Sequence, residues 1–382
     1  MHTSHTAKLD SQRLNEQYMQ RAIALAKRGE FTTSPNPVVG CVLVKNGDVV
    51  GEGWHQKAGE GHAEVNALQQ AGEQAKGATA YVTLEPCSHF GRTPPCAKGL
   101  IAAGIKHVVI GMVDPNPLVS GRGIKMLEEA GITTEVAVLE SAANMLNPGF
   151  IKRMKTGKPF VRCKMAASLD GKTAMANGES KWITGSDARQ DVQRYRAKSC
   201  AIISGADTVM IDDAKLNVRY NELGFIANDL KEDDIRQPVR VIIDSQNRLT
   251  PSLALFNQQS PVILVRTTVE NEHQWPHFVK QIQVNERLGK ADLTDLITKL
   301  AELGLNTLWL ESGARLAGAF IRQNLVDELI LYQAPKLMGE NTRGLFDIEQ
   351  LTSLKDAISL DIKDIRMIGA DIKITATVNK QI

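Results

Sequence analysis

The helix and strand patterns of this chain run through one α/β succession, stop, and then begin a second one. The stop is an Asn-Pro-Gly sequence at 147–149, followed by the short polar stretch 155–159 (KTGKP). Proline and glycine interrupt helices and strands, and polar stretches between patterned segments are typical of linkers. A chain of 382 residues is also longer than one hydrophobic core usually serves. The sequence therefore predicts two α/β domains, residues 1–150 and residues 151–382.

The first domain is expected to begin with a helix and a hairpin. Helix formers with apolar positions three and four apart cover residues 14–28, and the β-branched runs 38–44 and 49–54 follow. Asn46-Gly47 separates these runs and favours a type I′ turn, in which both central residues take positive φ. Further helices are expected over residues 63–70, 97–103 and 123–130, and strands over 78–84, 107–112 and 134–139. This order predicts a three-layer α/β/α sandwich.

The second domain repeats the alternation without a dinucleotide-binding fingerprint. Strands are expected over residues 160–166, 201–204, 239–244, 262–265, 307–310, 328–333 and 371–378, and helices over 187–198, 293–303 and 314–324. No Gly-x-Gly-x-x-Gly follows a strand, which argues against a Rossmann domain. Residues 308–318 predict a strand, a small-residue turn and a helix start, where free amides can bind a pyrophosphate. By itself this signal is weak, because a plain tight turn has the same pattern.

Composition and charge exclude several classes of protein. The formal net charge of +2 argues against a broad nucleic-acid or membrane surface. No apolar stretch is long enough for a transmembrane helix, and the polar segment 1–10 does not resemble a secretory signal. We therefore expect a cytoplasmic protein with no nucleic-acid or membrane partner. In that reducing compartment Cys41, Cys163 and Cys200, which lie in apolar segments, are expected to be core residues without disulfide bonds.

One group of residues has the composition of a catalytic zinc site. His62 and Glu64 lie two positions apart, and Cys87 and Cys96 follow. A catalytic zinc uses three protein ligands and leaves its fourth position to water, whose pKa it lowers to near neutrality. His62, Cys87 and Cys96 supply one imidazole and two thiolates. Glu64 could face that water without binding the metal, and it could pass the proton to a departing amine.

The spacing of the two cysteines departs from the common nucleobase-deaminase pattern. That pattern is His-x-Glu followed by Pro-Cys-x-x-Cys, whereas here the eight residues 88–95 separate Cys87 from Cys96. The insert must loop out so that Cys96 can return to the metal. Pro86 is expected at the start of a helix, whose positive end would favour the thiolate of Cys87. A closed structural zinc site would need a fourth ligand, for which His89 is the nearby candidate.

Longer motifs resemble one known family. Segments 34–40 (SPNPVVG) and 83–96 (TLEPCSHFGRTPPC) closely resemble the deaminase half of the bifunctional riboflavin-biosynthesis deaminase-reductases, in which the long cysteine spacing is usual. Segments 164–172 (KMAASLDGK) and 206–219 (ADTVMIDDAKLNVR) resemble the reductase half. The resemblance covers nearly the whole chain in family order. It implies a cytidine-deaminase-like first domain and a dihydrofolate-reductase-like second domain.

The resemblance also implies the chemistry. Zn²⁺-dependent hydrolytic deamination would act on 2,5-diamino-6-(5-phosphoribosylamino)pyrimidin-4-one, and NADPH-dependent reduction of the ribosyl chain would give 5-amino-6-(5-phosphoribitylamino)uracil. The two steps could also occur in the reverse order. Zinc ligation is carried onto His62, Cys87 and Cys96, and the proton shuttle onto Glu64. The implied partners are a small phosphoribosyl pyrimidine and further copies of the chain in a homo-oligomer.

Contacts with cofactor and substrate follow from the same resemblance. NADPH contacts are implied for Ala166, Trp182, Thr208, Asp212, Ser245, Gly313, Ala314, Arg315, Leu316, Ala317, Gly318 and Ala319. Substrate contacts are implied for Asn36, His89, Lys164, Ser180, Arg196, Leu216, Arg219 and Glu311. Arg196 and Arg219 could hold a phosphate, because guanidinium groups offer several planar donors; without the resemblance, surface charges would be the simpler interpretation. Lys164, Asp212 and Glu311 are expected nearest the reacting ribose carbon.

Two other functions remain open at this point. One is a nucleoside, nucleotide or tRNA deaminase whose second domain has no catalytic role, although the near-neutral charge disfavours a tRNA substrate. The other is a zinc-stabilised ligand-binding or regulatory protein without turnover. Glu64 argues against the second, because a structural zinc site needs no proton shuttle.

Overall fold

The computed structural model describes residues 2–88, 94–117, 119–270, 273–348 and 351–379. It divides into two compact units, Met1–Gly157 (unit 1) and Lys158–Ile382 (unit 2). The division lies inside the polar stretch 155–159. The Asn-Pro-Gly sequence at 147–149 begins helix α6 (Pro148–Thr156) instead of interrupting the chain. Proline is suited to the first helical position because the N–H it lacks has no partner there in any helix.

Unit 1 is a three-layer sandwich around a mixed sheet. Over the described residues its helices are α1 (His2–Lys27), α2 (Ala63–Ala71), α3 (Cys96–Ala102), α4 (Arg122–Glu129), α5 (Glu140–Leu146) and α6. Its strands are β1 (Gly40–Lys45), β2 (Asp48–Trp54), β3 (Thr79–Val82), β4 (His107–Ile110) and β5 (Thr133–Val136), in the order β2-β1-β3-β4-β5. Strand β1 is antiparallel to both neighbours, and β3, β4 and β5 are parallel.

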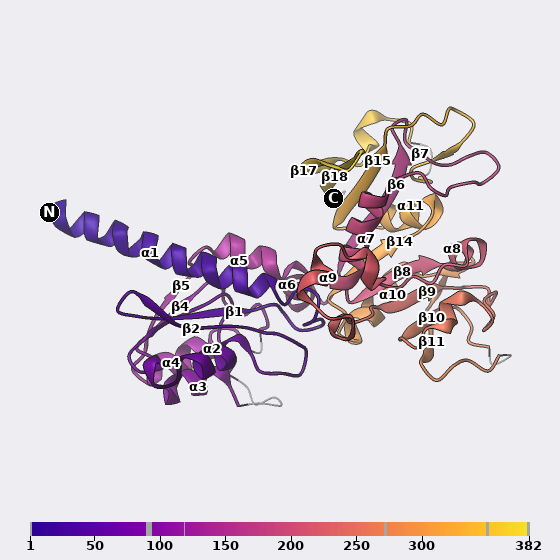
Figure 1. Ribbon diagram of the computed structural model, residues 1–382. Helices are drawn as coiled ribbons and strands as arrows, with labels where there is room; N and C mark the ends of the chain where they lie inside the picture. The colour runs from indigo at the N-terminus through magenta and orange to yellow at the C-terminus, as the bar shows by residue number, and fades with distance from the viewer. Residues whose placement is uncertain (1, 89–93, 118, 271–272, 349–350, 380–382) are drawn as a thin grey trace. The chain divides into compact units, whose positions relative to one another are not determined.

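Each face of this sheet has its own apolar core. Side chains of α1 and α5 pack with Val42 and Val109 on one face, and those of α2, α3 and α4 pack with Leu43 and Val108 on the other. Figure 1 shows the two helix layers on opposite sides of the strands. Alternate residues of one strand supply the two cores because strand side chains point to opposite faces in turn. The predicted α/β/α sandwich is confirmed.

The predicted hairpin is also confirmed. Asn46 and Gly47 connect β1 to β2, and both have positive φ, 53° and 89°. Behind the hairpin, Gly53 of β2 lets α2 approach closely, because a Cβ on Gly53 would lie 2.3 Å from the carbonyl oxygen of Ala63. This close packing fixes the start of α2, where His62 and Glu64 lie.

Unit 2 is a larger α/β domain with its own sheet. Over the described residues its helices are α7 (Ser186–Lys198), α8 (Ala206–Asp212), α9 (Ile226–Asp229), α10 (Leu293–Glu302) and α11 (Ala314–Arg322). Its strands are β6 (Phe160–Ser168), β7 (Lys172–Ala174), β8 (Ala201–Gly205), β9 (Val239–Ile243), β10 (Val262–Arg266), β11 (Val279–Gln283), β12 (Glu286–Arg287), β13 (Lys290–Ala291), β14 (Thr307–Glu311), β15 (Glu328–Ala334), β16 (Arg343–Gly344), β17 (Leu360–Ile368) and β18 (Asp371–Val378).

The main sheet of unit 2 has the strand order β11-β10-β9-β8-β14-β6-β15-β18-β17. Its strands are parallel up to β15, and β18 and β17 complete it as an antiparallel pair. Helices α10 and α11 pack against Cys163 and Cys200 in the core on one face of this sheet. Helix α7 packs with Trp309 in the core on the other face. As predicted, Cys163 and Cys200 are core residues, and Cys41 is one in unit 1.

Strand β17 was not predicted from the sequence. Apolar residues in this segment lie at Leu360, Ile362, Ile365 and Met367, so the alternation slips by one position at Lys363. A β-bulge between Ile362 and Asp364 accounts for the slip, because a bulge adds one residue to a strand without exchanging its faces. No helix in the described part of the chain is long and apolar enough to cross a membrane.

Candidate active sites

The start of α2 positions two of the residues predicted for a metal site. His62 immediately precedes the helix, with φ −72° and ψ 168°, and Glu64 lies in the first turn. Asn66 ties this turn to the hairpin, because its Nδ2 donates to the carbonyl oxygen of Trp54 at 2.8 Å. His62 and Glu64 therefore occupy a fixed position beside the end of β2.

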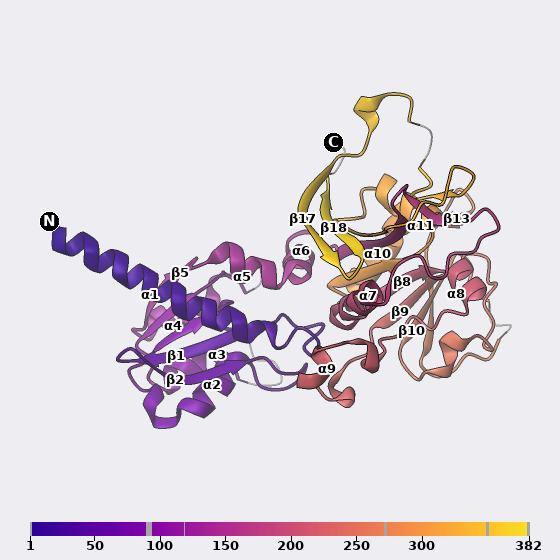
Figure 2. The same ribbon diagram turned by 45° about the horizontal axis from the view of Figure 1, so that its top comes forward.

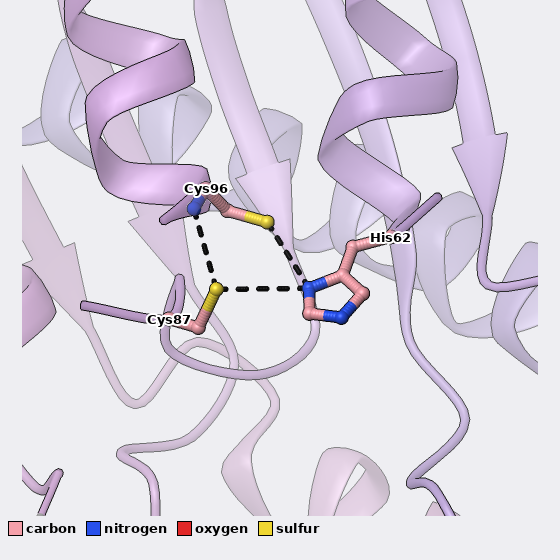
Figure 3. Close-up of side chains that lie close together, drawn as sticks. All are labelled: His62, Cys87 and Cys96. Carbon is pink, nitrogen blue, oxygen red and sulfur yellow. Dashed lines mark hydrogen bonds between the residues drawn. The ribbon is translucent and has the colours of Figure 1, made fainter. Parts of the chain in front are cut away.

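Three metal-ligating atoms converge on one point. Nδ1 of His62 lies 3.2 Å from Sγ of Cys96 and 3.6 Å from Sγ of Cys87, as Figure 3 shows. All three atoms lie within 4.8 Å of one another, and no second cluster of this kind is found among the described residues. Tetrahedral zinc with its usual bond lengths separates nitrogen from sulfur by about 3.5 Å. The donor set and its spacing fit zinc.

The helix near Cys87 begins later than predicted. Pro86 does not start a helix; α3 begins at Cys96, with Pro95 preceding it. Cys87 lies outside the helices and strands, but its Sγ still accepts a hydrogen bond from the backbone N–H of Cys96 at 3.2 Å. A hydrogen bond with the Cys96 side chain lowers the pKa of the Cys87 thiol. The first amide of α3 therefore supports the thiolate in place of the predicted helix at Pro86.

Glu64 is buried beside the three ligands, with 3% of its surface exposed. Burial is the main cause that raises the pKa of Glu64 to about 7, and the charge of Cys87 raises it further in the same direction. A carboxyl group with a pKa near the working pH can accept a proton and return it with little energetic penalty. The position and the environment of Glu64 suit the predicted proton shuttle.

Glu85 is a supporting residue that the sequence analysis did not single out. Its buried carboxylate accepts hydrogen bonds from the backbone N–H groups of Asp114 at 3.1 Å, Gly121 at 3.0 Å and Gly123 at 2.9 Å. These bonds tie the start of α4 to the segment that carries Cys87. Glutamate beside proline and cysteine gives no local signal for this role, because its partners lie 29 to 38 residues later.

His55, which was not selected from the sequence, contacts two parts of the site. Its ring meets the ring of His62 edge-on, with the centroids 5.5 Å apart. Its Nδ1 lies 3.1 Å from the carbonyl oxygen of Gly61, and its Nε2 lies 3.2 Å from Nδ2 of Asn36. A carbonyl only accepts hydrogen bonds, so Nδ1 is the donor, and Nε2 of the neutral ring accepts from the Asn36 amide. This contact does not use the side-chain oxygen of Asn36, which can therefore face another group.

In unit 2 the predicted substrate residues include a buried ion pair. Arg196 of α7 forms a two-pronged contact with Glu311 at the end of β14: Nε donates to Oε1 at 2.6 Å and Nη2 donates to Oε2 at 2.7 Å. Lys164 of β6 is the register partner of Glu311 on the neighbouring strand. The structure therefore brings Lys164, Arg196 and Glu311 together beside the carboxyl end of β14. α/β domains usually bind ligands at the carboxyl ends of their parallel strands.

Charge and burial determine the protonation of this group. Burial disfavours the charged form of Glu311, but Arg196 and Lys164 outweigh it and lower the pKa of Glu311 to about 2. Burial lowers the pKa of Lys164. Trp309, which the sequence analysis did not select, donates from Nε1 to Glu311 at 2.6 Å and stacks on Tyr195 with ring centroids 4.6 Å apart. Residues two apart in a strand point to the same side, so Trp309 lies on the same face of β14 as Glu311.

The turn before α11 has open space beside Gly313. Gly313 precedes the helix with φ −72°, which any residue can adopt, and a Cβ there would meet no described atom within 4 Å. Packing within the chain therefore does not explain this glycine, while a phosphate needs open space beside helix amides. By contrast, a Cβ on Gly318 would lie 2.3 Å from the carbonyl oxygen of Asp347, and Ala317 is buried in the core. Those two residues have clear packing roles.

The other predicted contacts differ in how far they are exposed. Trp182 is 64% exposed, with the guanidinium of Arg189 stacked 4.8 Å above it. Asp212 forms an ion pair with Lys181 at 3.1 Å, and Arg219 forms one with Glu222 at 2.6 Å. Leu216 is buried in the core beside α7, and His89 lies outside the described residues. The remaining predicted contacts are partly or fully accessible: Ala166, Ser180, Thr208, Ser245, Ala314, Arg315, Leu316 and Ala319.

Two family models match the two units separately. The cytidine and deoxycytidylate deaminase zinc-binding region matches residues 12–112, and the RibD C-terminal domain matches residues 159–374. The chain is 55% identical to the riboflavin biosynthesis protein RibD of Haemophilus influenzae, over 94% of this chain and 96% of that protein. Its identity to the Escherichia coli protein of the same name is 52%, over 94% and 98% of the two chains.

Solved structures show the same relationship. RibD of Acinetobacter baumannii superimposes with a TM-score of 0.88 at 43% identity, covering 97% of this chain and all of that chain. A diaminohydroxyphosphoribosylaminopyrimidine deaminase/5-amino-6-(5-phosphoribosylamino)uracil reductase of Thermotoga maritima superimposes with a TM-score of 0.84 at 32% identity, with the same coverage. Both matches extend over the two units.

Proposed function

The chain belongs to the RibD family of riboflavin-biosynthesis proteins, and on that basis we propose that it deaminates 2,5-diamino-6-(5-phosphoribosylamino)pyrimidin-4-one and reduces the ribosyl chain to give 5-amino-6-(5-phosphoribitylamino)uracil. Membership confirms the resemblance predicted from the sequence, the two-domain α/β fold class, the deaminase and reductase activities, and zinc and NADPH as cofactors. The observation that carries the proposal is the convergence of three ligand atoms within 4.8 Å beside buried Glu64.

In unit 1, His62, Cys87 and Cys96 would hold zinc and leave one position open. Zinc in such a site makes water acidic enough to act as a nucleophile near neutral pH. Glu64 accepts the proton from the attacking water and delivers it to the amino group that leaves as ammonia. Asn36, held by His55 at its Nδ2, presents its Oδ1 to an N–H group of the pyrimidine. His89 remains a candidate substrate contact from the family resemblance.

In unit 2, Glu311 holds Arg196 through two hydrogen bonds, and Lys164 is the register partner of Glu311 on the neighbouring strand. NADPH supplies a hydride for reduction of the ribose carbon. The amides at Gly313 and Ala314 suit its pyrophosphate, because they start α11 and have open space beside them. Lys164, with its pKa lowered by burial, is the register partner of Glu311 and takes no part in the two-pronged Arg196–Glu311 contact. It is therefore our candidate for orienting the opened sugar.

A non-catalytic second domain is disfavoured, because residues 159–374 match the RibD C-terminal domain. A zinc protein without turnover would have no use for a buried carboxylate at position 64. The small phosphoribosyl pyrimidine is the proposed substrate, and a homo-oligomer is the proposed assembly.

The substrate proposal is tested by incubating the zinc-loaded protein with the diaminopyrimidinone ribosyl phosphate and NADPH. Ammonia and oxidised NADPH should form in equal amounts, and mass spectrometry should identify the phosphoribitylaminouracil. Release of ammonia without oxidation of NADPH would contradict the reductase assignment. If neither product appears from protein that contains zinc, the substrate assignment is wrong.

A further inference from the structure

Asp191 of α7 is the centre of a buried polar group that the proposed mechanism does not use. Its Oδ2 accepts a hydrogen bond from the hydroxyl of Tyr332 at 2.7 Å and one from Nζ of Lys373 at 2.6 Å. Tyr332 is fully buried, and the side chains of Lys373 and Asp191 are 8% and 13% exposed. We call these three residues the α7 anchor.

The hydroxyl of Tyr332 is a permanent donor in this group. Burial is the main cause that raises the pKa of Tyr332 well above its usual value, and the charge of Asp191 raises it further. The Asp191 carboxylate therefore accepts from two donors, one neutral and one cationic. A buried polar group whose members satisfy one another favours one arrangement of the elements that carry them.

The anchor attaches α7 to strands β15 and β18. Tyr332 of β15 and Lys373 of β18 are register partners, and side chains of register partners point to the same face of a sheet. This is the face that α7 covers, because Ala188 and Val192 of the helix pack in one core with Tyr332. The anchor therefore fixes the helix at one side of the central strands.

The start of α7 is attached to the same side of the sheet. The backbone N–H of Gly185, which precedes the helix, donates to the carboxylate of Asp371 at 2.7 Å. Gly369, in the turn before β18, leaves space for the carboxylate of Asp187, with which a Cβ at position 369 would collide. Figure 2 shows the turn between β17 and β18 beside α7.

The other attachment of α7 is the predicted substrate residue Arg196. Its guanidinium binds Glu311 of β14 through two hydrogen bonds. Asp191 and Arg196 are five residues apart, which places them about 140° apart around the helix axis. A helix that is held along one line can roll about that line, whereas a helix held along two such lines cannot. The two attachments together therefore fix the rotation of α7.

Aromatic rings connect the two attachments. Nζ of Lys373 lies over the ring of Tyr195, 4.5 Å from its centroid, and a cation is attracted to the face of such a ring. Tyr195 stacks on Trp309 with the ring centroids 4.6 Å apart, and Nε1 of Trp309 donates to Glu311 at 2.6 Å. A shift of α7 at the anchor would therefore disturb the partners of Glu311.

The strand that carries Lys164 lies between the two attachments. Strand β6 is placed between β14 and β15 in the sheet. The register partners of Lys164 are Glu311 on β14 and Ile330 on β15, and Ile330 packs in the same core as α7. The helix therefore crosses the sheet beside the residue that is our candidate for orienting the opened sugar.

From these contacts we propose that the α7 anchor positions the reductase site. It fixes α7 across β6, so that Lys164, Arg196 and Glu311 meet the phosphoribosyl substrate in one arrangement. The inference rests on the reductase function proposed for unit 2. A buried ion pair is weak evidence for stability, because apolar side chains of similar size often replace it without loss. The anchor should therefore matter more for the reaction than for folding.

The proposal is tested with a triple variant of the full chain, Asp191→Leu with Tyr332→Phe and Lys373→Met. It removes all three polar groups together and leaves none of them buried without its partner, so the denaturation midpoint should stay close to that of the wild type. For the deaminated ribosyl substrate, kcat/KM should fall about tenfold, since a misplacement of about 1 Å can cost about a hundredfold. The KM for NADPH should stay the same.

Two milder variants and a matched control accompany the triple variant. Tyr332→Phe removes one hydroxyl and should show the same selective loss to a smaller extent. Asp191→Glu keeps a carboxylate and should retain more activity than the triple variant. The control is Arg162→Met with Glu328→Leu, which removes another ion pair of the same sheet, at 2.6 Å between β6 and β15, without touching α7. Its kcat/KM should equal that of the wild type.

A second measurement follows the same site without activity. The indole N–H of Trp309 is buried and bonded to Glu311, so it should exchange slowly with solvent. In the triple variant its exchange, measured by NMR, should be about tenfold faster, because local opening becomes easier. In the control variant it should be unchanged. Trp309→Phe identifies the signal among those of the four tryptophans.

The outcomes separate this inference from the proposed function. A triple variant that unfolds, or one with wild-type kcat/KM, would overturn the positioning role. An equal loss in the control variant, or a parallel rise in the KM for NADPH, would mean that unit 2 is loosened as a whole and would also overturn it. A wild-type protein that oxidises no NADPH would contradict the reductase function, and unchanged exchange of the Trp309 indole would then overturn the anchor as well.

Discussion

Units 1 and 2 hold the polar groups of their sites in opposite ways. In unit 1 the ligand atoms of His62, Cys87 and Cys96 face one another within 4.8 Å, an arrangement that a cation would stabilise. In unit 2 Arg196, Glu311 and Trp309 already satisfy one another through hydrogen bonds of 2.6 to 2.7 Å. The first site is therefore arranged around a bound metal, and the second is arranged by the chain itself.

This difference shows what each cofactor contributes to its site. Removing the metal from unit 1 leaves three ligands without the charge that binds them together. Removing NADPH from unit 2 leaves the Arg196–Glu311 pair intact. We therefore expect the two activities to respond independently to metal removal and to substitution. The following experiments test whether the two sites are independent in this way.

Zinc removal should have the largest effect, and only on unit 1. A chelator should abolish ammonia release, because the nucleophile depends on the metal. Reduction of the already deaminated ribosyl substrate should continue at its original rate. One equivalent of zinc per chain, measured by elemental analysis, should accompany full deamination. If chelation stopped both reactions equally, the independence of the sites would be contradicted.

Glu311→Gln should have the next largest effect, and only on unit 2. The substitution leaves the guanidinium of Arg196 buried without its carboxylate, which costs about 3–5 kcal/mol in comparable buried pairs. NADPH oxidation should fall strongly, and the denaturation midpoint of unit 2 should decrease. Glu328→Gln is the control, because it removes another ion pair of unit 2, with Arg162, away from the proposed site. Equal loss of NADPH oxidation in both variants would mean that Glu311 has only a structural role.

His55→Ala should have a moderate effect on unit 1. It removes the acceptor that holds the Asn36 amide, so kcat/KM for deamination should fall about tenfold, the value of one hydrogen bond of about 1.4 kcal/mol. Bound zinc should stay at one equivalent, because His55 contributes no ligand. His55→Gln, which can still accept from Asn36, should recover part of the loss. A loss of zinc in the alanine variant would contradict a positioning role.

Acidification should have the smallest effect in the physiological range, and it acts on unit 2. The pKa of Glu311 is lowered from its usual 4.5 to about 2 by Arg196 and Lys164 against burial. A carboxylate with a lowered pKa stabilises the folded state above its unfolded pKa, and this stabilisation is lost as the pH falls through the folded value. The contribution should therefore be complete above about pH 5. Unfolding of Glu311→Gln should depend less on pH between about 4.5 and 2 than unfolding of the wild type.

The metal site was predictable from the sequence because few residue types bind zinc. His62, Cys87 and Cys96 are informative even when far apart, since their combination has few other uses. The helix at Pro86 was predicted wrongly because proline is compatible with a helix start and with an extended segment. His55 was passed over because a single histidine at a strand end has no pattern, and its contacts with Asn36 and Gly61 arise only on folding.

The reductase site was harder to predict from the sequence than the metal site, for a physical reason. Lys164, Arg196 and Glu311 are ordinary charged residues, and their roles depend on which strands become neighbours. Alternation in β14 would have placed Trp309 with Glu311, but not with Tyr195 of α7. Strand β17 was missed because its bulge breaks the two-residue period. In each case the missing information is long-range pairing, which no local pattern contains.

The most direct test of two independent sites is the Glu64→Gln variant, with ammonia and NADPH absorbance measured in one reaction series. The glutamine side chain keeps the size of the glutamate but cannot carry the proton, so deamination should fall by about 10²- to 10⁴-fold. Zinc content, and the reduction of deaminated substrate, should equal those of the wild type. Unchanged ammonia release, or a parallel loss of reduction with zinc retained, would contradict the account.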